Sequence, residues 1–177
     1  MNFDKLKSQI EEATREAFIE MVAKHKAEGI YAFALYSDDG AMTVCPATNT
    51  LEKLKNADSD DLAYYKFSEA EWMYEGEGAD AKFKAICTLV REKVIKKGDD
   101  EKWFEDFQNK LYETCIEVLE NLKNEGFFKS VLDVDIFLNF EVTEYEFRRK
   151  KVKEIISRLN GDKYKNEYFE WMKTWGK

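Results

Sequence analysis

The sequence has one histidine and three cysteines, which limits the chemistry that it can perform. A Ser-His-Asp triad, a Cys-His pair or a zinc-histidine cluster would need His25, whose place among lysines near a helix end favours a solvated surface residue. Cys45, Cys87 and Cys115 are odd in number, widely spaced and without a Cys-x-x-Cys motif. They form neither a disulfide framework nor a zinc-ligand pattern, and we interpret them as packed thiols of a reducing compartment.

Signal peptides, long apolar runs and phosphate-binding loops are also missing. Residues 1–7 open directly into charged amphipathic sequence, and no uncharged run approaches the length that crosses a bilayer. The segment Gly76-Glu77-Gly78 is too short for a phosphate-binding loop and lacks its Lys-Ser/Thr pair. We therefore expect a soluble, cytoplasmic protein without a cofactor, a nucleotide or a membrane partner.

Basic residues are outnumbered, since 36 acidic and 28 basic side chains leave a net charge of −8. This balance opposes the counterion release on which nucleic-acid binding depends, so we expect no nucleic-acid partner. An acidic surface steers a basic protein partner inward, and it also serves simple solubility.

Proline is nearly absent, and the one proline, Pro46, leaves the rest of the chain free to form long helices. The 177 residues suit one domain that folds without staples, and no linker or repeat divides residues 1–177. Apolar residues at helical spacing, with capping and stop signals, predict helices over residues 2–28, 49–56, 79–96, 99–125, 143–159 and 164–175.

Strand signals occur in two regions. Residues 30–36 are apolar at odd and even positions alike, which predicts a central strand covered on both faces. The turn residues Asp38-Asp39-Gly40 and the segment 41–45 complete a β-hairpin. Residues 132–142 alternate apolar and polar, which predicts a strand with one buried face. Phe137 breaks the alternation, and we expect another element to cover it.

Residues 62–76 combine strand-type and helix-type sequence, and we predict a short strand followed by one helical turn. The aromatic stripe of the last helix, formed by Tyr164, Tyr168, Trp171 and Trp175, should dock on the body of the domain. The fold class is α+β, with a small, mainly antiparallel sheet packed with several helices in a single domain.

Two places could carry chemistry on a strand. Cys45 precedes Pro46 at a strand end, where a thiolate could act as a nucleophile, although an inert packed cysteine explains it as well. Asp133 and Asp135, with Glu141, could present oxygen ligands to a hard cation such as magnesium. Alternation alone also explains these acids as a solvated face, and we assign no metal.

Carboxylates gather in the hairpin turn and around Trp72, and two of them could form an acid/base pair. They are Asp38, Asp39, Glu69, Glu71, Glu75 and Glu77. Turn formation and solubility explain them too, so we assign no catalytic residue.

The most distinctive sequence lies in three segments, YAFALYSDDG (31–40), MTVCPATNT (42–50) and YYKFSEAEWMYEG (64–76). Together they resemble an uncharacterised bacterial family, domain of unknown function 4303. They match its aspartate-glycine turn, its Cys-Pro-x-x-Asn-Thr segment and its Ser-x-Ala-Glu-Trp-x-Tyr-Glu motif. The resemblance is strongest over 30–76, and Phe67 stands where the family favours tryptophan.

The resemblance implies no catalytic residues, but it implies a context, since such small acidic proteins are often encoded near toxin genes and resemble immunity proteins. We therefore expect a non-enzymatic module that binds a basic protein such as a toxin. Trp72 and Tyr74 would be its aromatic anchors, and Asp38, Asp39, Glu71 and the Asp133–Glu141 face would steer the partner.

Two alternatives stay open at the level of sequence. One is a hydrolase or transferase that uses Cys45 or a carboxylate pair. The other is a structural subunit of a larger assembly, if Trp171 and Trp175 are exposed. The oligomeric state does not follow from the sequence.

Overall fold

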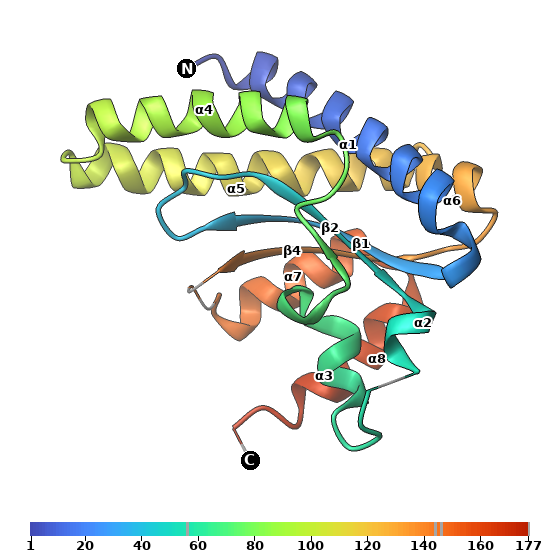
Figure 1. The fold of residues 1–177 in the computed structure, drawn as a ribbon. Coiled ribbons are helices and arrows are strands. Elements are labelled where there is room, and N and C mark those ends of the chain that lie inside the picture. The colour runs from blue at the N-terminus through green and yellow to red at the C-terminus, as the bar shows by residue number, and fades with distance from the viewer. Residues whose placement is uncertain (56, 144, 146, 177) are drawn as a thin grey trace.

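The computed structural model describes residues 1–55, 57–143, 145 and 147–176. A four-stranded sheet lies between two layers of helices in a single α+β domain (Figure 1). The strands are β1 (Ile30–Asp38), β2 (Cys45–Thr50), β3 (Tyr74–Glu75) and β4 (Phe137–Thr143). Their order in the sheet is β3-β2-β1-β4, so that the predicted central strand is indeed an inner strand.

The sheet is mixed. β1 pairs antiparallel with β2, and β2 pairs antiparallel with β3, which confirms the hairpin and the mainly antiparallel sheet. β4 pairs parallel with β1, from Ala32 opposite Phe137 to Asp38 opposite Thr143. A parallel neighbour needs a long crossover, and the helices between β3 and β4 provide it.

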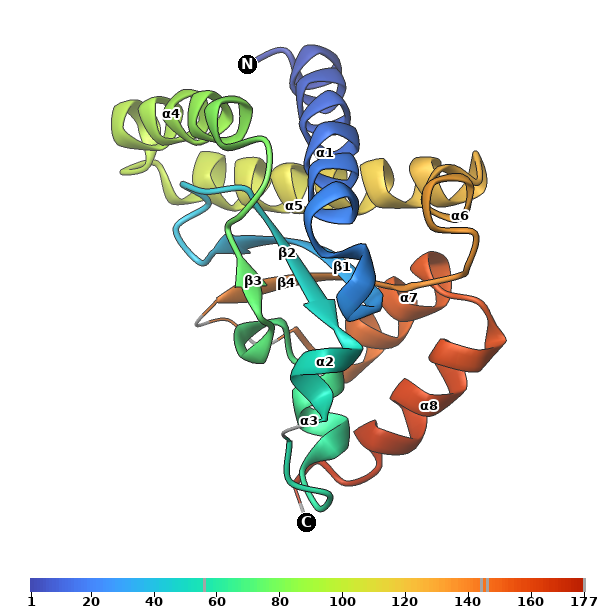
Figure 2. The same cartoon turned by 45° about the vertical axis from the view of Figure 1, so that its right-hand side comes forward.

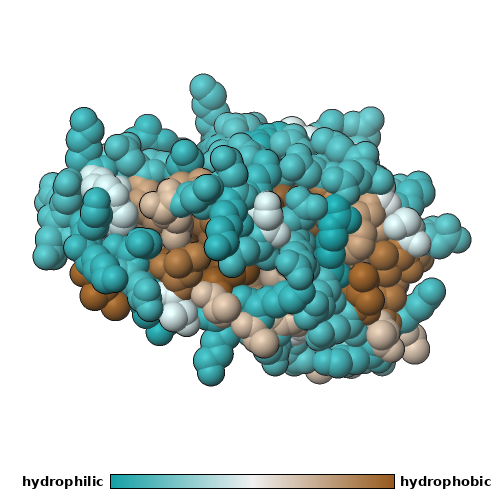
Figure 3. Space-filling model, turned by 90° about the horizontal axis from the view of Figure 1, so that it is seen from above, coloured by the Kyte–Doolittle hydropathy of each residue, from teal (hydrophilic) through white to brown (hydrophobic). Residues whose placement is uncertain are grey.

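One face of the sheet is covered by α1 (Phe3–His25), α4 (Asp80–Lys97), α5 (Glu101–Asn124) and α6 (Phe127–Leu132). Seen from above, the outside of this layer is mostly hydrophilic, with hydrophobic residues between (Figure 3). Two of the predicted helices have an N-cap side chain at their start. The Asn2 side chain accepts a hydrogen bond from the Lys5 backbone amide, and the Asp100 side chain accepts one from the Trp103 backbone amide. The apolar stripes predicted for these long helices form the main core.

The other face is covered by α2 (Leu51–Leu54), α3 (Leu62–Phe67), α7 (Arg149–Leu159) and α8 (Asp162–Met172). Two 3₁₀ turns, η1 (Lys26–Glu28) and η2 (Glu69–Glu71), complete the described elements. Figure 2 shows α3 and α8 on the side of the sheet opposite α1 and α5. A second core lies here, and Phe137 is covered by Phe67, Trp72 and Tyr168, as the break in alternation predicted.

The prediction of a strand at 132–142 is wrong about where the strand starts and about its exposed face. Helix α6 continues to Leu132, and Asp133 then takes a left-handed conformation (φ 63°), so that the strand begins only at Phe137. Residues 137–140 are buried at every position, because α7 and α8 cover the face that the alternation marked as solvated.

Three further boundaries differ from the sequence prediction. Residues 64–67 are helical in α3, which Asp61 precedes as N-cap, rather than a strand. The second hairpin strand begins at Cys45 instead of 41, because Asp38 accepts bonds from the Met42 amide and the Thr43 hydroxyl and holds a wider turn. Helix α7 begins at Arg149, and Glu144 and Glu146 of the predicted capping box lie outside the described residues.

The outer edge of β4 is closed by a side chain. At the end of α7, the buried Asn160 accepts the Leu138 amide at 2.9 Å, and its own amide donates to the Leu138 carbonyl at 2.7 Å. The amide group thus replaces a neighbouring strand at this point of the edge.

Replacing Asn160 by alanine should lower the free energy of unfolding by about 3 kcal/mol, because it leaves the buried Leu138 amide and carbonyl without partners. Urea unfolding of wild type and Asn160→Ala measures the loss. Asn166→Ala, at an exposed position of α8, is the matched control and should change little. Equal stability of the two variants would contradict the role assigned to Asn160.

Candidate functional site

A groove of about 1200 Å³ opens on the face of the sheet that carries the second core. It is lined by residues of α3, η2, β4, α7 and α8, by Tyr145 and Phe147 before α7, and by the segment after α8. Aromatic side chains dominate its lining and are Tyr64, Phe140, Tyr145, Phe147, Tyr168, Trp171 and Trp175. The groove also contains a carboxyl group, which distinguishes it from an ordinary apolar cleft.

Glu69 brings this carboxyl group into the groove. The residue is only 4% exposed, and its Oε2 has no hydrogen-bond partner among the described residues. Burial raises the pKa of Glu69 to about 7, its own backbone amide partly opposes the shift, and the charge of Glu75 adds to it. A buried acceptor without a partner is costly and is the kind of exception that a ligand explains.

The position of Glu69 follows from the residues on either side of it. Helix α3 ends at Phe67, and a 3₁₀ turn closes when the Trp72 amide donates to the Glu69 carbonyl at 3.0 Å. Phe67 and Trp72 both pack on Phe137. The turn between them is therefore held against the sheet, and Glu69 is buried with it.

A buried asparagine fixes both ends of this segment. The Asn49 amide donates to the Tyr31 hydroxyl at 2.9 Å and to the Tyr65 carbonyl at 3.3 Å. Its Oδ1 accepts the Met73 amide at 3.3 Å. Asn49 thus ties β2 to the chain before and after the 3₁₀ turn that carries Glu69.

Helix α8 supplies the aromatic wall. Tyr168 is 2% exposed, and burial together with the charge of Glu69 raises the pKa of its hydroxyl, which stays protonated. Trp171 and Trp175 are half-buried and meet edge to face at 5.0 Å. Arg149 of α7 donates to the Trp175 carbonyl at 2.5 Å and holds Trp175 beside α7.

The polar residues of β4 also belong to the groove. Asn139 is buried and donates to Glu141 Oε1 at 2.6 Å. Both were expected on a solvated face, and instead the helices of the second layer cover that face. Glu141 therefore adds a second carboxylate to the lining.

The other predicted site residues do not converge. Asp38, Asp39 and Cys45 lie at the β1–β2 turn, where Asp38 organises the turn and the Asp39 carbonyl accepts the Gln108 amide at 2.5 Å. Cys45 is half-buried beside Cys87 of α4. None of these three residues lines the groove.

The predicted residues of the Ser-x-Ala-Glu-Trp-x-Tyr-Glu motif are held by local contacts. Glu71 accepts the Tyr64 hydroxyl at 3.1 Å, and Trp72 is buried in the second core. Tyr74 donates to Glu28 at 2.7 Å and stacks on His25 at 4.0 Å, so the histidine is half-buried in a cluster rather than fully solvated. In this structure Trp72 is a core residue and offers no surface anchor.

Asp133 and Asp135 lie before β4, at the end of the sheet away from Asp38, because β4 runs parallel to β1. Both are exposed, and Asp135 pairs with Lys129 at 3.4 Å. Within the residues that the structure describes, no group of three or more His, Cys, Asp or Glu side chains could hold a metal ion.

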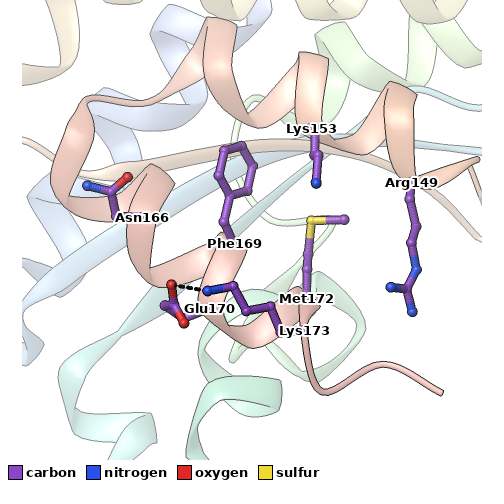
Figure 4. Close-up of a pocket in the computed structure, with 7 residues that line it drawn as sticks. All are labelled: Arg149, Lys153, Asn166, Phe169, Glu170, Met172 and Lys173. Atoms are coloured by element: carbon purple, nitrogen blue, oxygen red, sulfur yellow. Dashed lines mark hydrogen bonds and ion pairs between the residues drawn. The ribbon is translucent and has the colours of Figure 1, made fainter. Parts of the chain in front are cut away.

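A smaller pocket of about 360 Å³ lies between α7 and α8 (Figure 4). Exposed charged side chains surround Phe169 and Met172 there, and Lys173 pairs with Glu170 at 2.6 Å. Because Glu170 and Lys173 satisfy each other, this pocket gives a weaker indication of a ligand than the groove.

A family model described as Domain of unknown function (DUF4303) matches residues 10–161. The chain belongs to this family. No curated protein and no solved structure matches the chain. The part of the DUF4303 protein matched by the model includes Asn49, Glu69 and the polar residues of β4, and it ends before α8 with Trp171.

Among the residues that the structure describes, no helix is both long enough and apolar enough to cross a bilayer. At the level of sequence Glu69 is one of several clustered carboxylates, and the predicted binding residue was Glu71 of the same DUF4303 motif. The available signal was the position of Glu69 between Phe67 and Trp72, two large apolar residues that must both be buried.

Glu69→Gln should flatten the dependence of stability on pH. The folded-state pKa is raised from 4.5 to about 7, so the wild type loses stability as pH rises through this window, by roughly 3 kcal/mol at most. Urea unfolding at pH 5 and pH 8 should show this loss in the wild type and not in Glu69→Gln. Glu71→Gln, two residues away and half-exposed, should keep the wild-type slope. If the stability of Glu69→Gln fell with pH as steeply as that of the wild type, the raised pKa of Glu69 would be refuted.

Proposed function

We propose that this protein is a non-enzymatic binding module whose groove receives a basic side chain of a protein partner. The observation that carries the proposal is the Glu69 carboxyl group, buried and without a partner for Oε2 in an open aromatic groove. A lysine or arginine side chain supplies what this group lacks, which is a donor and a positive charge.

The aromatic wall supports a cationic occupant as well. The faces of Tyr168, Trp171 and Trp175 carry negative potential, so that they attract ammonium or guanidinium groups while they pack on the alkyl stem. The net charge of −8 steers a basic partner toward the protein. None of the described residues that line the groove is a cysteine or a histidine, so the usual nucleophile and base are absent among them.

We further propose that the partner is a toxin and that the protein neutralises it in the cytoplasm by occupying its active surface. Support comes from the context that the family resemblance implies, in which such small acidic proteins resemble immunity proteins encoded near toxin genes, together with the acidic charge. A groove that captures a basic side chain suits this role, because many nucleic-acid-cleaving and membrane-active surfaces are basic.

A second candidate function is a hydrolase that uses a carboxyl pair. Glu69, with its pKa raised to about 7, and Glu141 line the same groove and would be general acid and general base. The Asn139 amide already donates to Glu141. We favour binding, because turnover needs both groups on one bond, whereas capture of a cation needs Glu69 alone.

A small cation tests the groove directly. n-Butylammonium should quench tryptophan fluorescence in the wild type, and its affinity should rise as pH increases through about 7, because binding needs ionised Glu69. Glu69→Gln should weaken binding about tenfold and remove the pH dependence. Neutral n-butanol and the Glu71→Gln variant are the controls. Equal binding of ammonium and alcohol would rule out recognition of charge.

The partner is tested by co-expression with candidate toxin genes chosen from those encoded next to this one. The wild type should restore growth and co-purify with the toxin, whereas Glu69→Gln and Trp171→Ala should lose both effects while remaining folded by circular dichroism. Lys173→Ala, at an exposed position outside the groove, should still protect. Full protection by Glu69→Gln, or no protection by the wild type, would contradict the proposal.

A further inference from the structure

Two of the three cysteines meet although 42 positions separate them. Cys45 begins β2, and Cys87 lies in the middle of α4. The Val44 amide donates to Cys87 Sγ at 3.4 Å, and the Cys87 thiol lies 3.4 Å from the Val44 carbonyl, which can accept from it. Cys45 directly follows Val44 in the chain. The fold thus brings the Cys87 thiol to the start of β2, beside Cys45.

Both thiols are more accessible to solvent than the thiol of the third cysteine. They also differ from each other in acidity. Cys45 and Cys87 are half-buried, whereas Cys115 is fully buried in the main core. The pKa of Cys87 is lowered by the neighbouring Cys45 thiol, the Val44 amide and the charge of Arg91, against the effect of burial. The same contact and burial raise the pKa of Cys45. Cys87 is therefore the better nucleophile.

We propose that Cys45 and Cys87 are a site of reversible oxidation, at which a peroxide converts the two thiols into a disulfide between β2 and α4. The Cys87 thiolate attacks one oxygen of hydrogen peroxide, an S–O bond forms, the O–O bond breaks, and hydroxide leaves and takes up a proton. Cys45 then gives up its proton and attacks the sulfur of the sulfenic acid. An S–S bond forms, the S–O bond breaks, and water leaves.

The disulfide would close the chain between the two cysteines. Residues 46–86 contain α2, α3, β3 and the 3₁₀ turn with Glu69. A covalent link between the ends of this segment restricts it mainly in the unfolded chain. The oxidised protein should therefore resist unfolding better than the reduced one. The inference rests on the thiol contact and does not depend on the function proposed for the groove.

The full-length chain, reduced and then treated with hydrogen peroxide under native conditions, tests the proposal. When the thiols are counted in denaturant, so that the buried Cys115 is also exposed, we expect two of the three to have become unreactive toward Ellman's reagent. Peptide mapping should give a cross-linked peptide that contains Cys45 and Cys87, and dithiothreitol should release it. The midpoint of thermal unfolding should be higher for the oxidised than for the reduced protein. Three reactive thiols after oxidation, a link through Cys115 or a link between two chains would overturn the proposal.

Single variants separate the roles of the two thiols. Cys115→Ser should still form the cross-link, and Cys87→Ser should abolish it. Cys45→Ser should also abolish it but leave Cys87 as a sulfenic acid that dimedone traps, because the nucleophile remains and its resolving partner is gone. Trapping at Cys45 in Cys87→Ser, with none at Cys87 in Cys45→Ser, would reverse the assignment and refute the mechanism.

Discussion

The rest of the structure depends on one strand, β1, which is paired along both edges and covered on both faces. In the middle of the strand the two faces differ in the size of their side chains, whereas Tyr31 and Tyr36 border the second core toward its ends. Phe33 and Leu35 enter the main core under α1 and α5, whereas Ala32 and Ala34 face the second layer. These small residues leave room above the sheet for the large aromatic rings of the second core. A strand that is apolar from residue 30 to 36 thus supports two cores of different character.

Two of the three segments that carry the family resemblance, with the Cys-Pro-x-x-Asn-Thr and Ser-x-Ala-Glu-Trp-x-Tyr-Glu motifs, are joined in space by Asn49. Its side chain contacts the chain at Tyr65 and Met73, on either side of the 3₁₀ turn with Glu69. Such a buried amide with several partners specifies one arrangement of the segments that it joins. A large part of the two motifs is therefore explained by packing and by this hydrogen-bond network.

Glu69 is not explained by packing. Its neighbours Phe67 and Trp72 must be buried, yet a carboxyl group carried in between them gains nothing from burial and loses water. Unfavourable arrangements such as a buried carboxyl group without a partner occur most often at functional sites, where binding of a ligand offsets the free-energy cost of burial. The half-buried thiols of Cys45 and Cys87 also lack a packing explanation, since an inert core cysteine would be enclosed, as Cys115 is.

The sequence alone determined the elements whose patterns are local. The helical stripes of α1, α4 and α5, the doubly covered β1 and the covering of Phe137 follow from periodicity, because each pattern records which sides of one segment avoid water. Tertiary structure decided what depends on partners far along the chain. The parallel pairing of β4, the helical state of residues 64–67 and the burial of Asn139 are of this kind. The candidate site is also of this kind, because Glu69 meets α8, and Cys45 meets Cys87, only when distant segments pack on the same sheet.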